Sequence, residues 1–106
     1  MRSILLLALV PACVATSYTF SPTARGITPR EASCEFSIIA ATPDEPFEEV
    51  GTMKHYNGDI PTTEAAFRKA IASTVCDNGG HAVVATPTNK NYESATMIRY
   101  SKDFHQ

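Results

Sequence analysis

The sequence predicts an α+β fold, a small two-layer domain in which one helix packs on a four-stranded sheet in the order ββαββ. The prediction depends on one amphipathic segment with two β-rich segments on either side of it. Residues 34–41 and 47–56 precede the amphipathic segment, and residues 81–86 and 95–100 follow it. The chain has 106 residues, which is enough for one small domain.

The first two predicted strands are separated by turn-forming residues. They read CEFSIIAA and FEEVGTMKHY, with β-branched and aromatic side chains, and TPDEP lies between them. We therefore expect a hairpin, with a β-bulge at Gly51.

The helix is predicted from its cap, its apolar face and its end. Thr62 or Thr63 can cap its N-terminus, and the negative charge of Glu64 stabilises the positive end of the helix dipole there. One apolar stripe follows at helical spacing: Phe67, Ala70, Ile71, Thr74 and Val75. Asn78-Gly79-Gly80 ends the helix. A right-handed crossover would set the third strand parallel to the second, in one sheet that the helix covers on one face.

The first twelve residues have the layout of a secretory signal. A short positive region at Met1–Ser3 precedes an apolar run at Ile4–Val10 and the small residue Ala12. The run is shorter than a membrane-spanning helix requires. The alternative is that this segment is a buried strand or helix of the domain.

The residues Val10-Pro11-Ala12-Cys13 resemble the bacterial lipobox, in which a cysteine is lipidated and becomes the new N-terminus. The resemblance implies a lipid such as palmitate on Cys13, although Pro11 departs from the family's common Ala, Ser or Thr. The alternative is ordinary cleavage after Ala15, because Cys13-Val14-Ala15 fits a small-x-small rule. Cleavage there would give a freely secreted, disulfide-bonded protein.

The number of cysteines agrees with lipidation. Three cysteines cannot all pair within one exported chain, and a lipid on Cys13 leaves Cys34 and Cys76 as a single pair. On a helical wheel, however, Cys76 lies nearly opposite Phe67. The disulfide then requires a loosened last helical turn, or a Cys34 that lies on a segment running over the helix.

Residues 13–33 are rich in Ser, Thr, Pro and Ala and predict a flexible tether between the lipid and a domain at residues 34–106. Such a tether would let the domain stand about 25 Å from the membrane. The alternative is that residues 18–20 form an extra edge strand, since SYTF favours β-structure.

The chain resembles small bacterial outer-membrane lipoproteins, a broad group that includes the Rcs envelope-stress sensor lipoprotein. The matching segments are Cys34, Glu49-Val50-Gly51 and residues 76–84. The resemblance implies a ββαββ fold and a disulfide. Val14 follows the lipid site in place of the Asp that signals inner-membrane retention in some bacteria, which implies the outer membrane.

Composition and motifs argue against nucleic-acid binding and catalysis. The formal charge is −2 and no Lys/Arg cluster occurs, so we expect no nucleic-acid partner. Residue types that can bind metals or act with a thiol occur singly and outside known motifs: His55, Asp59, Asp77, His81 and Cys76. A metal- or thiol-dependent enzyme is therefore the weaker alternative, and we expect no enzyme, cofactor or metal.

The sequence favours a lipid-anchored protein of the cell envelope that acts as a non-catalytic binding or structural module. Its partners would be the membrane, through the lipid, and an envelope protein or cell-wall component that the sequence does not identify. The candidate contact residues are Asn89, Lys90, Asn91 and Tyr92, with Tyr56 and Tyr100 as further exposed aromatics.

Overall fold

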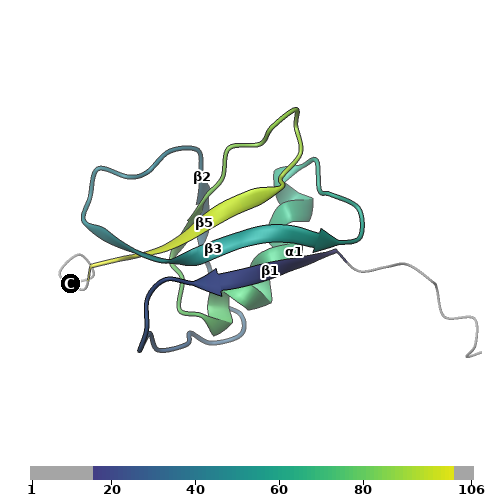
Figure 1. The fold of residues 1–106 in the computed structure, drawn as a ribbon. Helices are drawn as coiled ribbons and strands as arrows, with labels where there is room; N and C mark the ends of the chain where they lie inside the picture. The colour runs from purple at the N-terminus through teal and green to yellow at the C-terminus, as the bar shows by residue number, and fades with distance from the viewer. Residues whose placement is uncertain (1–15, 102–106) are drawn as a thin grey trace, which may run out of the picture.

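The computed structural model describes residues 16–101, which form a five-stranded mixed sheet and one helix (Figure 1). The elements in chain order are β1 (Ser17–Pro22), β2 (Ser37–Ile39), β3 (Phe47–Asn57), α1 (Glu64–Asp77), β4 (Ala82–Val84) and β5 (Ser94–Tyr100). The predicted α+β class is confirmed. The sheet has one strand more than the sequence predicted.

The strand order in the sheet is β1-β3-β5-β4-β2. β3 pairs antiparallel with β1 and with β5, β4 pairs antiparallel with β5, and β2 pairs parallel with β4. β3 and β4 therefore run in the same direction, as predicted for a crossover, with β5 between them. Figure 1 shows α1 on one face of the sheet, so the fold has two layers.

The predicted hairpin between the first two strands of the ββαββ order is wrong. The strand at Ser37–Ile39 lies at an edge of the sheet and pairs with β4, and the Ile39 carbonyl accepts a 2.9 Å hydrogen bond from the Ala85 amide. Residues 40–46 carry the chain from this edge to the middle of the sheet. Pro43 and Pro46 in this segment lack the amide donors of a tight hairpin turn.

β1 is the strand that the sequence did not predict, and it lies within residues 13–33, where a flexible tether was predicted. Tyr18 and Phe20 pair with His55 and Met53 of β3 and pack against the core, as the edge-strand alternative requires. After β1 the chain still belongs to the domain, because the Thr23 amide donates to the Val50 carbonyl at 2.8 Å. The described part of the predicted tether is therefore folded on the domain.

Gly51 lies at the β-bulge that the sequence predicted. The register between β3 and β5 shifts between Glu49 and Gly51. A Cβ at Gly51 would lie 2.5 Å from Cζ of Phe20 and 2.6 Å from the Ser21 carbonyl oxygen. Glycine therefore both accommodates the bulge and lets β1 lie close to β3.

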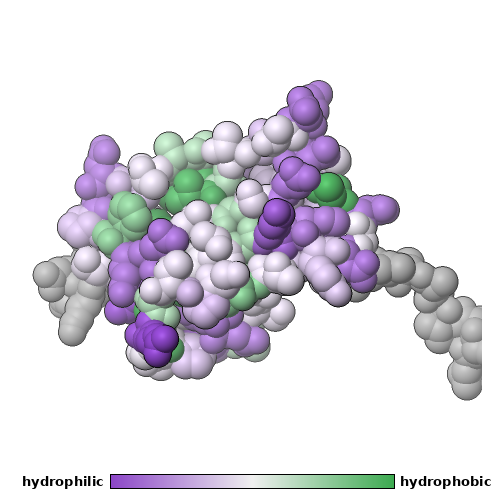
Figure 2. Space-filling model, viewed as in Figure 1, coloured by the Kyte–Doolittle hydropathy of each residue, from purple (hydrophilic) through white to green (hydrophobic). Residues whose placement is uncertain are grey.

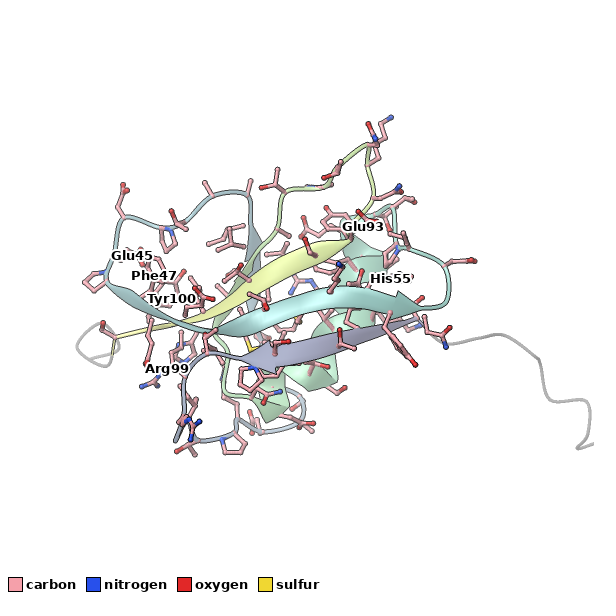
Figure 3. The ribbon with its side chains drawn as sticks, viewed as in Figure 1. Glu45, Phe47, His55, Glu93, Arg99 and Tyr100 are labelled. Atoms are coloured by element: carbon pink, nitrogen blue, oxygen red, sulfur yellow. A yellow bond between two sulfur atoms is a disulfide. The ribbon has the colours of Figure 1, made fainter. Side chains whose placement is uncertain are left out.

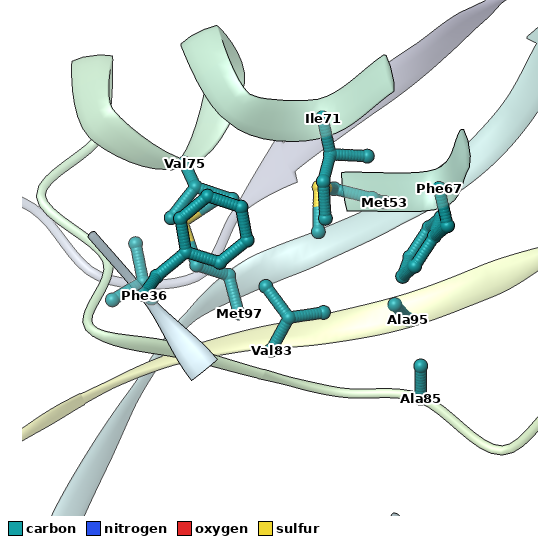
Figure 4. Packing of buried hydrophobic residues seen from close by; sticks show 10 residues of the cluster. Phe36, Met53, Phe67, Ile71, Val75, Val83, Ala85, Ala95 and Met97 are labelled. Atoms are coloured by element: carbon teal, nitrogen blue, oxygen red, sulfur yellow. The ribbon is translucent and has the colours of Figure 1, made fainter. Parts of the chain in front are cut away.

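The helix follows the predicted pattern closely. Thr63 is the N-cap, and its Oγ1 accepts a 3.1 Å hydrogen bond from the Ala66 amide. Phe67, Ile71 and Val75 are fully buried on one face. Figure 4 shows this face packed on side chains from several strands, including Met53, Val83, Ala95 and Met97. This cluster forms the core of the described domain.

Gly79 ends the helix at a positive φ of 75°, directly beneath residues 27 and 28. We expect Gly79→Ala to lower the free energy of unfolding by about 2 kcal/mol or more, because the new Cβ would overlap Ile27 and lie 2.6 Å from the Thr28 carbonyl oxygen. Urea unfolding followed by circular dichroism measures the loss.

Gly26 is the matched control, because it has a φ of 70° but a Cβ there would meet no atom within 4 Å. Gly26→Ala should cost about 1 kcal/mol, from the backbone conformation alone. Equal losses in the two variants would contradict the close packing under Gly79.

The sheet face opposite α1 is open to solvent (Figure 2). The strand register places the exposed side chains of Thr52 and Lys54 on this face, beside Thr96 of β5. Figure 2 shows mixed hydropathy over this face, with hydrophobic side chains toward the upper left and hydrophilic ones around them. A shallow groove across it is lined mainly by hydroxyl-bearing and aliphatic side chains.

Candidate functional site

Cys34 and Cys76 form a disulfide, with an S–S distance of 2.03 Å and a Cα–Cα distance of 5.7 Å. Cys34 lies on the segment that runs over the end of the helix, which is one of the two arrangements that the helical wheel allowed. Arg30 fastens this segment: its amide donates to the Cys76 carbonyl at 2.7 Å and its Nη1 to the Gly80 carbonyl at 2.6 Å. The third cysteine, Cys13, lies outside the described residues.

The histidines and acidic residues that might suggest chemistry are not brought together. Nδ1 of His81 accepts a 3.0 Å hydrogen bond from the Tyr100 amide. His55 packs edge-on against Tyr18, and its buried Nε2 has no hydrogen-bond partner. Within residues 16–101, no three His, Cys, Asp or Glu side chains lie together as a metal site would require.

The loop predicted as a partner contact divides into an exposed half and a packed half. Asn89 and Lys90 are exposed, at positive φ values of 53° and 67°, in a tight turn closed by hydrogen bonds between Thr88 and Asn91. Tyr92 instead stacks on Phe67, with ring centroids 4.5 Å apart. Tyr92 therefore has a structural role, and only the turn is free to contact a partner.

Tyr18 is held in the same aromatic group. Its hydroxyl donates to the Tyr92 carbonyl at 2.5 Å, and its ring lies edge-on to Phe67 at 5.6 Å. Burial raises the pKa of the Tyr18 hydroxyl from 10.0 to about 12, because a phenolate loses hydration in this environment.

The raised pKa of Tyr18 predicts a loss of stability in alkali. Between pH 10 and about 12 the unfolded chain releases this proton and the folded chain keeps it, so the free energy of unfolding falls as pH rises. The contribution of the Tyr18 hydroxyl to the free energy of unfolding is complete below pH 10. We expect the urea midpoint to drop between about pH 10 and about pH 12. The urea midpoint of Tyr18→Phe should drop less over this pH range than that of the wild-type protein. An equal drop in both proteins would contradict the prediction.

One end of the domain, which we call the proximal end, consists of Thr16, Tyr56–Pro61 and the loop at residues 86–93. Oγ1 of Thr16 donates to the Asp59 carbonyl at 3.0 Å, and the Tyr92 amide donates to the Pro61 carbonyl at 3.0 Å. Ser17 pairs with Asn57, so β1 begins where β3 ends (Figure 1). Tyr56 is 71% exposed, the most exposed large hydrophobic side chain of the described residues.

The opposite end, which we call the distal end, comprises residues 43–49 and 99–100. Figure 3 shows Glu45, Phe47, Arg99 and Tyr100 at this end of the sheet, and His55 and Glu93 at the other. Glu48 pairs with Arg99 at 3.2 Å, and Phe47 is 37% exposed.

Lysines and carboxylates are distributed unevenly between these two ends, although the proximal end also holds exposed carboxylates at Asp59 and Glu93. The distal end holds four exposed carboxylates: Asp44, Glu45, Glu48 and Glu49. The three lysines of the described residues lie toward the proximal end. Lys90 is in the exposed turn, Lys54 pairs with the first residue of β5, and Lys69 lines a groove with Thr16. Sequence reasoning missed this polarity, because it appears only when the strand directions are known.

Comparison of the chain with protein-family models, with curated proteins and with solved structures gives no significant match. Within residues 16–101, no helix is long and apolar enough to cross a membrane.

Proposed function

We propose that this protein is a lipid-anchored component of the bacterial cell envelope, in the outer membrane, whose domain is a non-catalytic binding or structural module. Cys13 is the proposed site of lipid attachment. The membrane is the first partner, and an envelope protein or cell-wall component is the second.

The observation that carries the proposal is the disulfide between Cys34 and Cys76. It uses two of the three cysteines in the chain, and the remaining one stands in Val10-Pro11-Ala12-Cys13. A disulfide is also the bond expected of a chain that works in an oxidising compartment. Lipidation would give a role to the third cysteine, since Cys34 and Cys76 are already bonded to each other.

The arrangement of polar groups supports a non-catalytic role for the described domain. The two histidines there are held at opposite ends of the sheet, His55 beside Tyr18 and His81 at the Tyr100 amide. Both described cysteines are oxidised, so neither is a nucleophile. A binding or structural role needs none of these groups.

The test is lipid attachment at Cys13 in a bacterial host. Cells expressing the full chain are grown with a labelled fatty acid, and the protein is purified from the membrane fraction for intact-mass measurement. We expect label on the wild-type chain and none on Cys13→Ser. Two or three acyl chains would hold the protein firmly, since each buried CH₂ contributes about 0.8 kcal/mol.

Two results would overturn the proposal. A mature chain that begins at Thr16 and is found in the medium would support the freely secreted alternative, in which the signal is cut after Ala15. Label that persists on Cys13→Ser would show that the lipid is attached elsewhere.

A further inference from the structure

We propose that the proximal end of the domain is a lipid-contacting surface that lies against the phospholipid headgroups of the membrane that holds the anchor. This inference rests on the proposed lipid at Cys13. It adds the orientation of the domain and identifies a second contact with the bilayer, made by the folded protein itself.

The first argument is the length of chain between the lipid and the sheet. Only three residue steps separate Cys13 from Thr16, which corresponds to about 11 Å when fully extended. Thr16 is already fixed to the domain by its hydrogen bond to the Asp59 carbonyl. The 11 residues of β3 span about 37 Å. The short link therefore holds the proximal end at the headgroups, whereas the distal end lies beyond its reach.

The second argument is the chemistry of the side chains at the proximal end. Tyr56, next to the residue that pairs with Ser17, extends an exposed ring with a polar tip. Tyrosines of this kind are enriched where membrane meets water, because the ring is apolar and the hydroxyl remains hydrated. Ile60 is partly exposed in the following loop and adds aliphatic surface.

The third argument is the charge difference between the two ends. Bacterial membranes contain anionic lipids, which attract nearby lysines and repel carboxylates. Lys69 and Lys90 lie toward the proximal end, which also carries exposed carboxylates at Asp59 and Glu93, whereas the distal end carries four exposed carboxylates within residues 44–49. The larger number of lysines at the proximal end and of carboxylates at the distal end therefore favours the same orientation as the short link.

This orientation changes the role of the exposed turn at Asn89 and Lys90. The turn lies at the proximal end, because the Tyr92 amide is bonded to the Pro61 carbonyl. Lys90 then faces lipid phosphates. The distal end, with Phe47 and the carboxylates around it, faces away from the membrane.

Single tryptophans can test this orientation, because the chain contains none. Tyr56→Trp places a fluorophore at the proximal end, and Phe47→Trp is its matched control at the distal end. Each full chain is expressed with its signal, purified from membranes and checked by mass for the lipid. It is then reconstituted into vesicles of phosphatidylethanolamine and phosphatidylglycerol, with and without bromine on the upper acyl carbons.

We expect the emission of the Tyr56→Trp protein to shift to the blue and to lose roughly half its intensity in brominated vesicles, because side chains at this boundary lie about 5–10 Å deep. The emission of Phe47→Trp should not change. Thermal unfolding should match wild type for both variants, so that a difference in quenching reports position.

The outcomes separate the two proposals. A lipidated Tyr56→Trp protein that is not quenched, or equal quenching of both variants, overturns the contact surface and leaves the lipid anchor standing. A mass without lipid on Cys13 overturns the proposed function, and the contact surface fails with it.

Discussion

Phe67→Ala should lower the free energy of unfolding by about 4 kcal/mol. The Phe67 ring is fully buried and joins three parts of the domain. It extends from α1, stacks on Tyr92 of the loop before β5 and meets the edge of Tyr18 in β1. Its removal leaves a cavity that these two rings cannot both fill. Because small domains have about 5–15 kcal/mol of stability in total, we expect a large shift in the urea midpoint.

Phe47→Ala is the matched control, since Phe47 is 37% exposed and pairs with Tyr100 at the distal end. It should cost about 1 kcal/mol or less. Hydrogen exchange adds a local measurement: in Phe67→Ala the Tyr92 amide, which is bonded to the Pro61 carbonyl, should exchange faster. A loss in Phe67→Ala no larger than in Phe47→Ala would contradict the packing described here.

The helix and the individual strands were largely predictable because their signals are local. Thr63 at the cap, the stripe containing Phe67, Ile71 and Val75, and Gly79 at the end each act within a few residues. The pairing of the strands was not predictable in the same way. A short apolar strand such as β2 fits equally well beside β3 or β4, and the choice depends on contacts far apart in sequence.

β1 was missed for a different physical reason. Its residues alternate regularly, with Tyr18 and Phe20 facing the core and Ser17, Thr19 and Ser21 facing outward. An edge strand with a polar outer side has the same composition as a linker, and the neighbouring Ser, Thr and Pro residues reinforced that interpretation. Gly51 was the unused signal, because a strand glycine also marks the close approach of another backbone.

Less of the candidate site than of the fold could be predicted. The sequence identified the cysteine pair and selected the loop at residues 89–92, but it did not indicate that Tyr92 is packed on Phe67. Nor did it show that Arg68 donates to the Phe36 carbonyl at 2.6 Å and lies over the Phe36 ring. Such contacts join residues 25 and 32 positions apart in the chain and have no local sequence pattern.

The double variant Cys34→Ala/Cys76→Ala should lose about 4 kcal/mol, because the disulfide closes a loop with a sequence separation of 42 residues and restricts the unfolded chain. The loss has a structural counterpart, since the segment from Ile27 to Cys34 is held over the end of α1 by this bond and by Arg30. Urea unfolding of the wild-type chain with and without a thiol reductant should show the same difference.

The unfolding of Cys13→Ser distinguishes a structural cysteine from an anchoring one. Cys13 has no partner in the disulfide, so this variant should keep the wild-type midpoint and should still be destabilised by reductant. A midpoint for the double variant that equals wild type would contradict the role assigned to the bond. The prediction also bears on the proposed export: if the chain is exported as proposed, its precursor in a reducing cytoplasm lacks this constraint, and the domain should reach its full stability only after export, when the bond forms.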